Sequence, residues 1–193
     1  MTAVKERIVG GAVRAFGKRA EVCEVAALSP RLRRLRFAGD AVAQMTWSAG
    51  DKIKLRVGDG VMRSYTPARV DARTGTMDIV FHLHGNGPAA AWAAAAQRGD
   101  TAWFFGPKTS MPAVGRDIAW ALFFGDETAL GLGLALAEAH GDRADVSGAI
   151  ELDRADLGAV AALGSTLTPV ARDAEYGDAL LRWLAERELP TGG

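Results

Sequence analysis

Short stretches in which apolar and polar residues alternate dominate the first part of the chain. In the clearest one, Met77, Ile79, Phe81 and Leu83 alternate with Asp78, Val80, His82 and His84. A period of two residues is typical of a strand with one buried face. The same reasoning predicts strands at residues 20–28, 31–38, 52–57 and 101–105. Residues 62–70 are predicted to be extended, and Pro67 indicates an edge position or a bulge there.

Tight turns and two helices separate these predicted strands. Glycine and aspartate mark turns at residues 58–60 and 71–75. A short helix is predicted near residues 41–45, and an alanine-rich helix from Pro88 to about Arg98. Pro88 suits a helix start, where its missing N–H would have no partner anyway. Many short strands with tight turns favour an antiparallel barrel, preceded by an arm or short helix at residues 1–19.

The pattern changes after Pro112. Residues 118–124 are a continuous apolar run, which is typical of a strand buried on both faces of a parallel sheet. Further strands are predicted at residues 144–150 and 165–170, with helices at residues 128–140, 154–162 and 176–188. This β-α-β-α-β-α order requires a parallel sheet with right-handed crossovers. We therefore expect an antiparallel barrel domain at residues 1–112 and a shortened α/β domain at residues 113–193, with the boundary near residues 112–116.

Charge divides along the same boundary, although the net charge of the 193 residues is +0. Residues 1–112 hold 17 Lys and Arg against 9 Asp and Glu, a net +8, and residues 113–193 hold 6 against 14, a net −8. A basic first part favours an anionic ligand, such as a nucleotide phosphate or an acidic chelate, and opposite charges also help two halves dock. Nucleic acid is not expected as a partner, because no helix carries a dense basic stripe.

Several classes of protein are disfavoured by simple counts. The single cysteine, Cys23, excludes a disulfide within the chain and makes a thiolate metal site improbable. No apolar run follows the charges at the N-terminus, so no signal peptide is expected. No run of 18 apolar residues is free of charge, so no membrane span is expected. These observations predict a cytoplasmic protein.

The first candidate site is the segment Arg63-Ser64-Tyr65-Thr66, just before Pro67. In an extended strand, Arg63 and Tyr65 point to one face, and Ser64 and Thr66 to the other. A guanidinium can pair with phosphate through two hydrogen bonds, and a phenol ring can pack beside a ring system. These residues could grip a flavin dinucleotide; a surface strand with an ordinary buried tyrosine is the alternative.

The second candidate site is the glycine-containing loop that opens the alanine-rich helix. Its sequence is His84-Gly85-Asn86-Gly87-Pro88-Ala89-Ala90, followed by Trp92. Glycines let the backbone approach a ligand, and the N-terminus of a helix favours an anion such as a pyrophosphate. A tight turn without a ligand is the alternative. His82 and His84 share a strand face, but two ligands without a third make a poor metal site, so no metal is expected.

Two further loops carry polar residues. Lys108 follows Gly106-Pro107 at a strand end, where it could contact phosphate or an acidic substrate, or simply be solvated. Asp126, Glu127 and Thr128 lie between a buried strand and a helix, where open α/β sheets present ligands. Asp126 could be the helix N-cap. Otherwise these acidic residues would meet a ribose and the flavin edge.

In this order, the segments resemble the siderophore-interacting protein family, which are flavin-dependent ferric-siderophore reductases of the ferredoxin-reductase superfamily. The family pattern is Arg-x-Tyr-Thr-x-Arg, His-Gly-x-x-Gly-Pro-Ala-x-x-Trp, Gly-Asp, Gly-Pro-Arg-Gly and Gly-Asp-Glu-Thr-Ala-Leu. The chain has Arg63 to Thr66, His84 to Ala89 with Trp92, Gly99-Asp100, Gly106-Pro107-Lys108 and Gly125 to Leu130. The resemblance covers residues 20–189.

The resemblance implies a role for each matched residue. Arg63 would meet the flavin phosphate, Tyr65 the flavin body and Thr66 the region of flavin N5, which makes Tyr65 and Thr66 the catalytic candidates. The implied cofactor-binding set is Arg63, Ser64, Tyr65, Thr66, His84, Gly85, Gly87, Pro88, Ala89, Ala90, Asp126, Glu127 and Thr128. Lys108 and Arg69 are the substrate-binding candidates.

The chain departs from the family pattern at several places. Ala68 stands where the second arginine of the first motif falls, with Arg69 next to it, and Ala90 stands where a hydroxyl residue is common. Lys108 and Thr109 replace Arg-Gly, which weakens a two-bond grip on an anion. In the family, another strand and helix follow and help to hold the nicotinamide, whereas this chain ends at Gly193.

The expected function is that of an FAD-dependent oxidoreductase. It would pass electrons from NADPH or NADH through FAD to a ferric siderophore or another small acceptor, and iron(II) would leave. The shortened C-terminal part leaves two alternatives open. One is a flavin or ferric-siderophore binding module without turnover, and the other is a generic flavin reductase that serves another acceptor.

Overall fold

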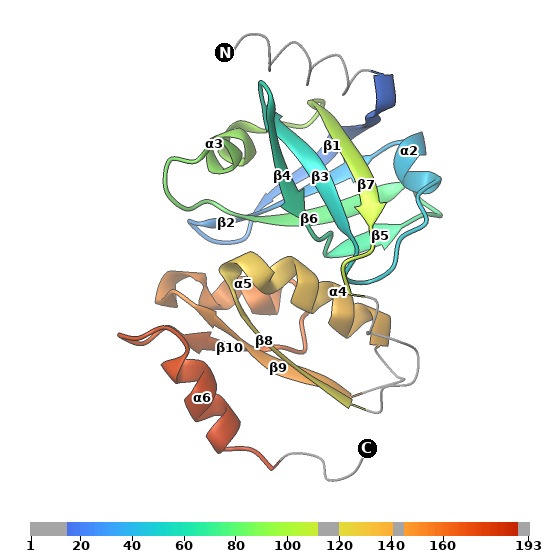
Figure 1. Ribbon diagram of the computed structural model, residues 1–193. Coiled ribbons are helices and arrows are strands. Elements are labelled where there is room, and N and C mark those ends of the chain that lie inside the picture. Colours follow the sequence, from blue (N-terminus) through green and yellow to red (C-terminus); the bar gives the residue numbers. More distant parts are fainter. Residues whose placement is uncertain (1–14, 112–119, 141–144, 189–193) are drawn as a thin grey trace.

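The computed structural model describes residues 15–111, 120–140 and 145–188, and two sheets organise them (Figure 1). Residues 15–111, called the barrel half here, form a curled seven-stranded antiparallel sheet in the order β4-β3-β7-β1-β2-β6-β5. Its strands are β1 Lys18–Ala27, β2 Leu32–Ala38, β3 Lys52–Gly58, β4 Val61–Tyr65, β5 Arg69–Asp71, β6 Thr76–His82 and β7 Thr101–Lys108. Its helices are α2 Asp40–Ala43 and α3 Pro88–Ala95.

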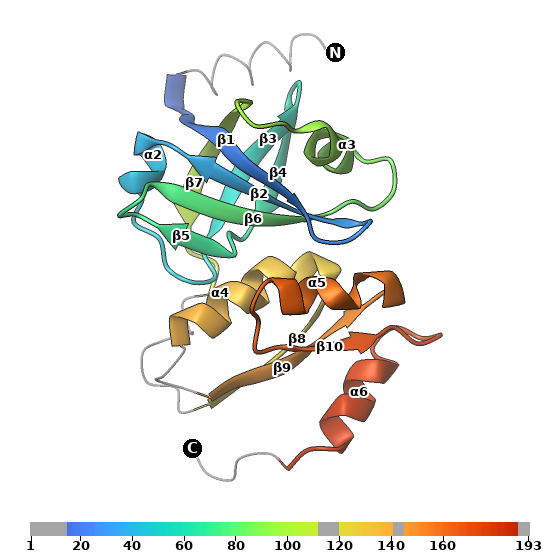
Figure 2. The ribbon, with the colours of Figure 1, turned by 180° about the vertical axis from the view of Figure 1, so that it is seen from behind.

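Residues 120–140 and 145–188, called the α/β half, form a three-stranded parallel sheet in the order β10-β9-β8. Its elements are β8 Trp120–Asp126, η1 Glu127–Ala129, α4 Leu130–His140, β9 Asp145–Leu152, η2 Arg154–Asp156, α5 Leu157–Ala162, β10 Thr168–Ala171 and α6 Asp178–Ala185. Helices α4 and α5 lie between this sheet and the barrel half, and α6 lies on the opposite face (Figures 1 and 2). These two sheets confirm the predicted fold class.

The expected extended segment at residues 62–70 is divided in two. Strands β4 and β5 stand at opposite ends of the seven-stranded order, and residues 66–68 join them. Both are edge strands, but Pro67 lies in the link between them and not within either strand. Proline fits this link because it has no N–H to give to a neighbouring strand.

The alternation in β6 is confirmed on one face and fails on the other. Met77, Ile79 and Phe81 are fully buried in the core of the barrel half. Val80, expected among the outward residues, is also buried, together with Asp78. The α/β half covers this second face, and Val80 belongs to an apolar cluster that crosses between the halves.

The interface between the halves has an apolar centre and polar contacts beside it. Leu32, Ala68 and Val80 of the barrel half share one cluster with Leu130 of α4 and residues from β9 and α5. On one side, Asp156 accepts hydrogen bonds from Ser29 and Arg31 of the barrel half. Elsewhere, Arg69 pairs with Glu138 at 3.1 Å. Burial of apolar surface together with these ion pairs holds the two halves in one arrangement.

Several element ends differ from the predictions. The alanine-rich helix ends at Ala95 rather than Arg98, and a turn closed by Asp100 follows it. Strand β7 runs on to Lys108, which pairs with Lys52 of β3. Strand β10 begins at Thr168 rather than residue 165.

Other predictions fall outside the described residues. These include residues 1–14 of the predicted arm and the predicted domain boundary at residues 112–116, so the domain division stays a prediction. Among the described residues, no helix has the length and apolar character needed to cross a membrane.

Candidate functional site

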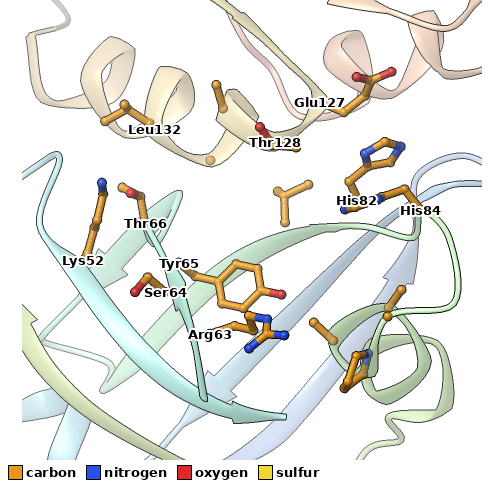
Figure 3. A pocket seen from close by; sticks show the side chains of 17 residues that line it. Lys52, Arg63, Ser64, Tyr65, Thr66, His82, His84, Glu127, Thr128 and Leu132 are labelled. Atoms are coloured by element: carbon orange, nitrogen blue, oxygen red, sulfur yellow. The ribbon is translucent and has the colours of Figure 1, made fainter. Parts of the chain in front are cut away.

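A cleft of about 600 Å³ lies where the barrel half meets the α/β half (Figure 3). It is lined by Lys52, Arg63, Ser64, Tyr65, Thr66, Val80, His82, His84, Gly87, Pro88, Ala89, Ala90, Glu127, Thr128, Ala129, Gly131 and Leu132. The first predicted motif, the start of α3 and the turn after β8 therefore share one cleft. Its volume falls in the range of cofactor sites, roughly 300–1,000 Å³.

Strand β4 supplies one wall of the cleft. Arg63 and Ser64 are exposed, and Tyr65 and Thr66 are half-buried. The Tyr65 ring packs on Phe81 with 4.7 Å between ring centroids, and burial raises the pKa of its hydroxyl, although Arg63 opposes this. The Arg63 guanidinium donates to the Met62 carbonyl at 3.0 Å. Arg63 thus offers a cation to the cleft beside an aromatic ring that is held by the core.

Helix α3 supplies a second wall. Gly87 is its N-cap and makes no side-chain capping hydrogen bond, and Pro88 occupies the first turn. The N–H groups of Ala89 and Ala90 are in the first turn, where a helix leaves its donors without intrahelical partners. A Cβ added at Gly85 or Gly87 would meet nothing within 4 Å, so a ligand can approach this loop closely. These features fit an anion.

The turn after β8 faces the cleft from the α/β half. Asp126 accepts from the Thr128 backbone N–H at 2.8 Å and from its hydroxyl at 2.6 Å, so it is the expected N-cap. Burial raises the pKa of Asp126, but these hydrogen bonds and one from the Ala129 backbone outweigh it, and the net pKa is lowered. Asp126 itself is not among the residues that line the cleft, whereas Thr128 is.

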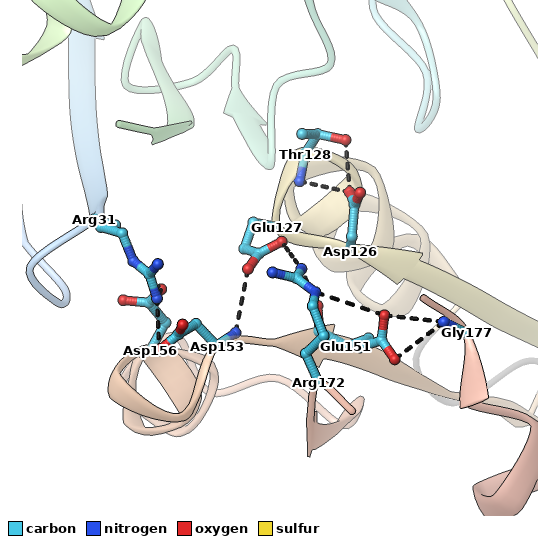
Figure 4. A network of polar contacts seen from close by, with 9 residues as sticks. All are labelled: Arg31, Asp126, Glu127, Thr128, Glu151, Asp153, Asp156, Arg172 and Gly177. Atoms are coloured by element: carbon cyan, nitrogen blue, oxygen red, sulfur yellow. Dashed lines mark hydrogen bonds and ion pairs between the residues drawn. The ribbon is translucent and has the colours of Figure 1, made fainter. Parts of the chain in front are cut away.

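Glu127 lines the cleft, but its carboxylate is already occupied (Figure 4). It accepts from the guanidinium of Arg172 and, at 3.2 Å, from the Asp153 backbone N–H. Arg172 also lies 3.7 Å from the buried carboxylate of Glu151. This arrangement favours a structural role for Glu127 at the carboxyl ends of the parallel strands over a direct contact with ribose.

His82 and His84 lie together at one edge of the cleft, with 5.0 Å between ring centroids. Burial lowers the pKa of His82, so its ring is neutral near neutral pH. Its Nδ1 atom is buried, with no hydrogen-bond partner among the described residues. Within the described part of the chain, no group of three His, Cys, Asp or Glu residues is arranged to hold a metal ion.

The structure does not bring every predicted site residue into the cleft. Lys108 is exposed and stands opposite Lys52 in the β3–β7 pairing. Arg69 lines a different cleft, of about 360 Å³, where it pairs with Glu138. Gly85 precedes the lining residues of α3 without being one of them.

Sequence reasoning missed other residues of the cleft. Lys52 is not among the candidate residues predicted from the sequence, yet it lines the cleft beside β4 (Figure 3). Gly131 was not singled out, yet a Cβ there would lie 2.7 Å from the Thr66 carbonyl oxygen, so glycine permits α4 to touch the end of the first motif. The glycines in α4 indicate that another segment could approach this helix closely, but the sequence does not show which segment it is.

The residues of the cleft fit FAD. Arg63 and the uncapped start of α3 suit phosphate groups, and the Tyr65 ring with the neighbouring hydroxyl of Thr66 suits an isoalloxazine edge. An antiparallel barrel beside a small parallel sheet is the ferredoxin-reductase-like fold. Phthalate dioxygenase reductase has this fold, with a TM-score of 0.75 at 13% identity over 92% of this chain and 59% of its own.

Residues 56–111 match the family model described as a siderophore-interacting FAD-binding domain. A siderophore utilization protein from T. fusca is 27% identical over 91% of this chain and 78% of its own, with a TM-score of 0.71. The siderophore-interacting protein SipS from Aeromonas hydrophila is 24% identical over 91% and 75%, also with a TM-score of 0.71. No curated protein matches the chain.

These findings confirm the predicted resemblance, and the matched model confirms FAD as the expected cofactor. Together with the fold, they indicate flavin-dependent electron transfer. One local difference stands out, because the family loop has two residues between its glycines and this chain has only Asn86. The cofactor contacts expected of His84 and Gly85 therefore stay predictions.

Proposed function

We propose that this protein is an FAD-dependent reductase that takes electrons from NADPH or NADH and passes them to a ferric siderophore. The observation that carries the proposal is the single cleft shared by β4, the start of α3 and the turn after β8. When bound there, FAD would supply the redox chemistry, accepting hydride and giving single electrons. The chain would supply binding, orientation and charge.

Three parts of the cleft would hold the cofactor. The Arg63 guanidinium and the N–H groups of Ala89 and Ala90 would bind phosphate oxygens. The Tyr65 ring would pack against the flavin body, and the Thr66 hydroxyl would orient the polar edge near N5, as the family resemblance implies. Burial of Tyr65 against Phe81 keeps that ring in place.

The α/β half is the proposed nicotinamide side. Open parallel sheets bind ligands at the carboxyl ends of their strands, and the turn at Asp126–Thr128 lies at such an end. Phthalate dioxygenase reductase, which shares the fold, transfers electrons from pyridine nucleotides to a [2Fe-2S] centre. This likeness supports a pyridine nucleotide as the donor.

A ferric siderophore is the proposed acceptor. The matched family model and the relatives from T. fusca and A. hydrophila are described as siderophore proteins. The net +8 of residues 1–112 supports an acidic chelate, and Lys52 and Arg63 bring two of these charges to the cleft. A cation beside the cleft also attracts anionic ligands from solution.

An absorption spectrum of the purified protein, before and after addition of FAD, is the first test. We expect a bound flavin, followed by rapid bleaching when NADPH or NADH is mixed in without oxygen. Ferric chelates should then restore the oxidised spectrum. A protein that takes up no flavin would refute the proposal.

The same experiment separates the alternatives. Bound flavin that neither nucleotide reduces would favour the binding module, and reoxidation by quinones or free flavin but not by ferric chelates would favour the generic reductase. Arg63→Ala should remove about 1.5–3 kcal/mol of FAD binding, roughly a 10- to 100-fold rise in Kd. Arg73→Ala, at an exposed turn outside the cleft, is the matched control.

A further inference from the structure

Arg33 lies on β2, and its guanidinium reaches the C-terminal end of α3. Nη1 donates to the Ala93 carbonyl at 2.7 Å and also to the Ala94 carbonyl, and Nη2 donates to the Ala96 carbonyl at 3.0 Å. The last carbonyls of a helix have no intrahelical partners, and a cation is favoured there by the helix dipole. One side chain from a neighbouring strand therefore caps α3.

Helix α3 has few other anchors. Its sequence is almost entirely alanine and shows no amphipathic pattern, and Ala93 is its buried residue. Trp92 packs parallel to Phe37, with 6.4 Å between ring centroids, and tilted on Phe81 at 5.8 Å. Small side chains give little packing energy, so the position of α3 depends on the Trp92 ring and the Arg33 guanidinium.

We propose that Arg33 is a positioning residue for the phosphate groups of the flavin. Helix α3 has eight residues and is about 12 Å long, so a tilt at one end displaces the other. By fixing the carbonyl end, Arg33 fixes where the opposite end presents the N–H groups of Ala89 and Ala90 to the cleft. The inference rests on the proposed FAD binding, and Arg33 itself does not line the cleft.

The proposal predicts which ligand is affected. The flavin ring would be held by Tyr65 at the end of β4 and by Thr66 just after it, and the phosphates partly by α3. Loss of Arg33 should therefore weaken the binding of FAD, which has two phosphates, and leave that of riboflavin, which has none, unchanged. We expect about a tenfold rise in the Kd for FAD, which corresponds to the loss of about one hydrogen bond between α3 and a phosphate.

The experiment uses the full chain and three variants. FAD and riboflavin are titrated into wild type, Arg33→Ala, Arg33→Lys and the exposed control Arg73→Ala, with flavin fluorescence as the readout. Arg33→Lys keeps the charge, but its single ammonium cannot span three carbonyls, so an intermediate loss is expected. Hydrogen exchange of the apoprotein should show faster exchange of the α3 amides in Arg33→Ala than in Arg73→Ala.

Each outcome decides the inference. A loss confined to FAD, with intermediate behaviour of Arg33→Lys, supports it. Equal losses for FAD and riboflavin, or Arg33 variants that match Arg73→Ala, overturn it, since a general structural role would move both ligands or neither. If Arg33→Ala does not fold, Arg33→Lys carries the same comparison. A wild type that binds no FAD refutes the proposed function, and the exchange data then show separately whether Arg33 holds α3.

Discussion

The contact between Asp156 and the barrel half offers a test of how the two halves are held together. Asp156 has 0% of its surface exposed. It accepts from the Ser29 hydroxyl at 2.5 Å. It also accepts from Arg31 Nε at 3.0 Å, and Arg31 Nη2 lies 2.9 Å from the same carboxylate (Figure 4). Arg31 also pairs with Asp153 at 2.7 Å. Substitution of either partner of the Arg31–Asp156 pair tests this contact.

The two removals should differ in cost. Arg31→Ala leaves a fully buried carboxylate with one hydroxyl donor, and breaking a buried ion pair in this way costs about 3–5 kcal/mol. Asp156→Asn leaves Arg31, whose side chain is 37% exposed and keeps Asp153 as a partner. Its cost is closer to that of a lost charged hydrogen bond, about 1.5–3 kcal/mol. Arg31→Ala should therefore be the worse variant by roughly 1–2 kcal/mol.

Urea denaturation followed by tryptophan fluorescence measures the difference, with the free energy of unfolding taken by linear extrapolation. Arg154→Ala, at an exposed arginine on the same turn as Asp156, should stay within about 0.5 kcal/mol of wild type. If Asp156→Asn lowers the free energy of unfolding as much as Arg31→Ala or more, then the buried carboxylate left without its cation is not the main source of destabilisation.

Two further predictions follow from close packing and burial. Gly131→Ala would place a Cβ 2.7 Å from the Thr66 carbonyl oxygen and should lower the free energy of unfolding by about 1–3 kcal/mol. Gly158→Ala, where an added Cβ meets nothing within 4 Å, should not lower it. Equal melting temperatures of the two variants would contradict the close packing at Gly131. Burial holds the pKa of His82 below its usual value, so as the pH falls through that usual value, near 6.5, the unfolded chain takes up the proton first and stability is lost. His82→Asn should reduce the loss of unfolding free energy between pH 7 and pH 5; an unchanged slope would show that other groups cause it.

Local patterns predicted most of the elements because strands and helices leave a period in the sequence. Strand β6 covers most of the alternation predicted at residues 77–84, ending at His82, and the helix that starts at Pro88 lies where its pattern predicts. The pattern did not show that Val80 is buried, since a period of two residues indicates one covered face and not the arrival of a second layer. Burial of that face depends on α4 and Leu130, which lie about fifty residues further along the chain.

The candidate site was predictable to the extent that its motifs are local. Arg63 to Thr66 and Gly87 to Ala90 all belong to the cofactor-binding set that the family resemblance implies, and the structure brings them together in one cleft. The roles of Arg33 and Lys52 were not predictable, because each depends on a neighbour chosen by strand order and helix placement. An isolated arginine in an alternating strand gives no sign that three helix carbonyls lie within its reach.

The link at residues 66–68 connects the barrel fold to the geometry of the cleft. It joins the two end strands of the seven-stranded order, and it also receives α4, because Gly131 lets the helix approach the Thr66 carbonyl. Helix α4 begins directly after the turn that carries Thr128, so this contact contributes to the spacing between the β4 wall and the α/β wall. Gly131 itself lines the cleft. A substitution that lifts α4 from Thr66 should therefore alter the cleft as well as stability, and flavin affinity should fall in Gly131→Ala.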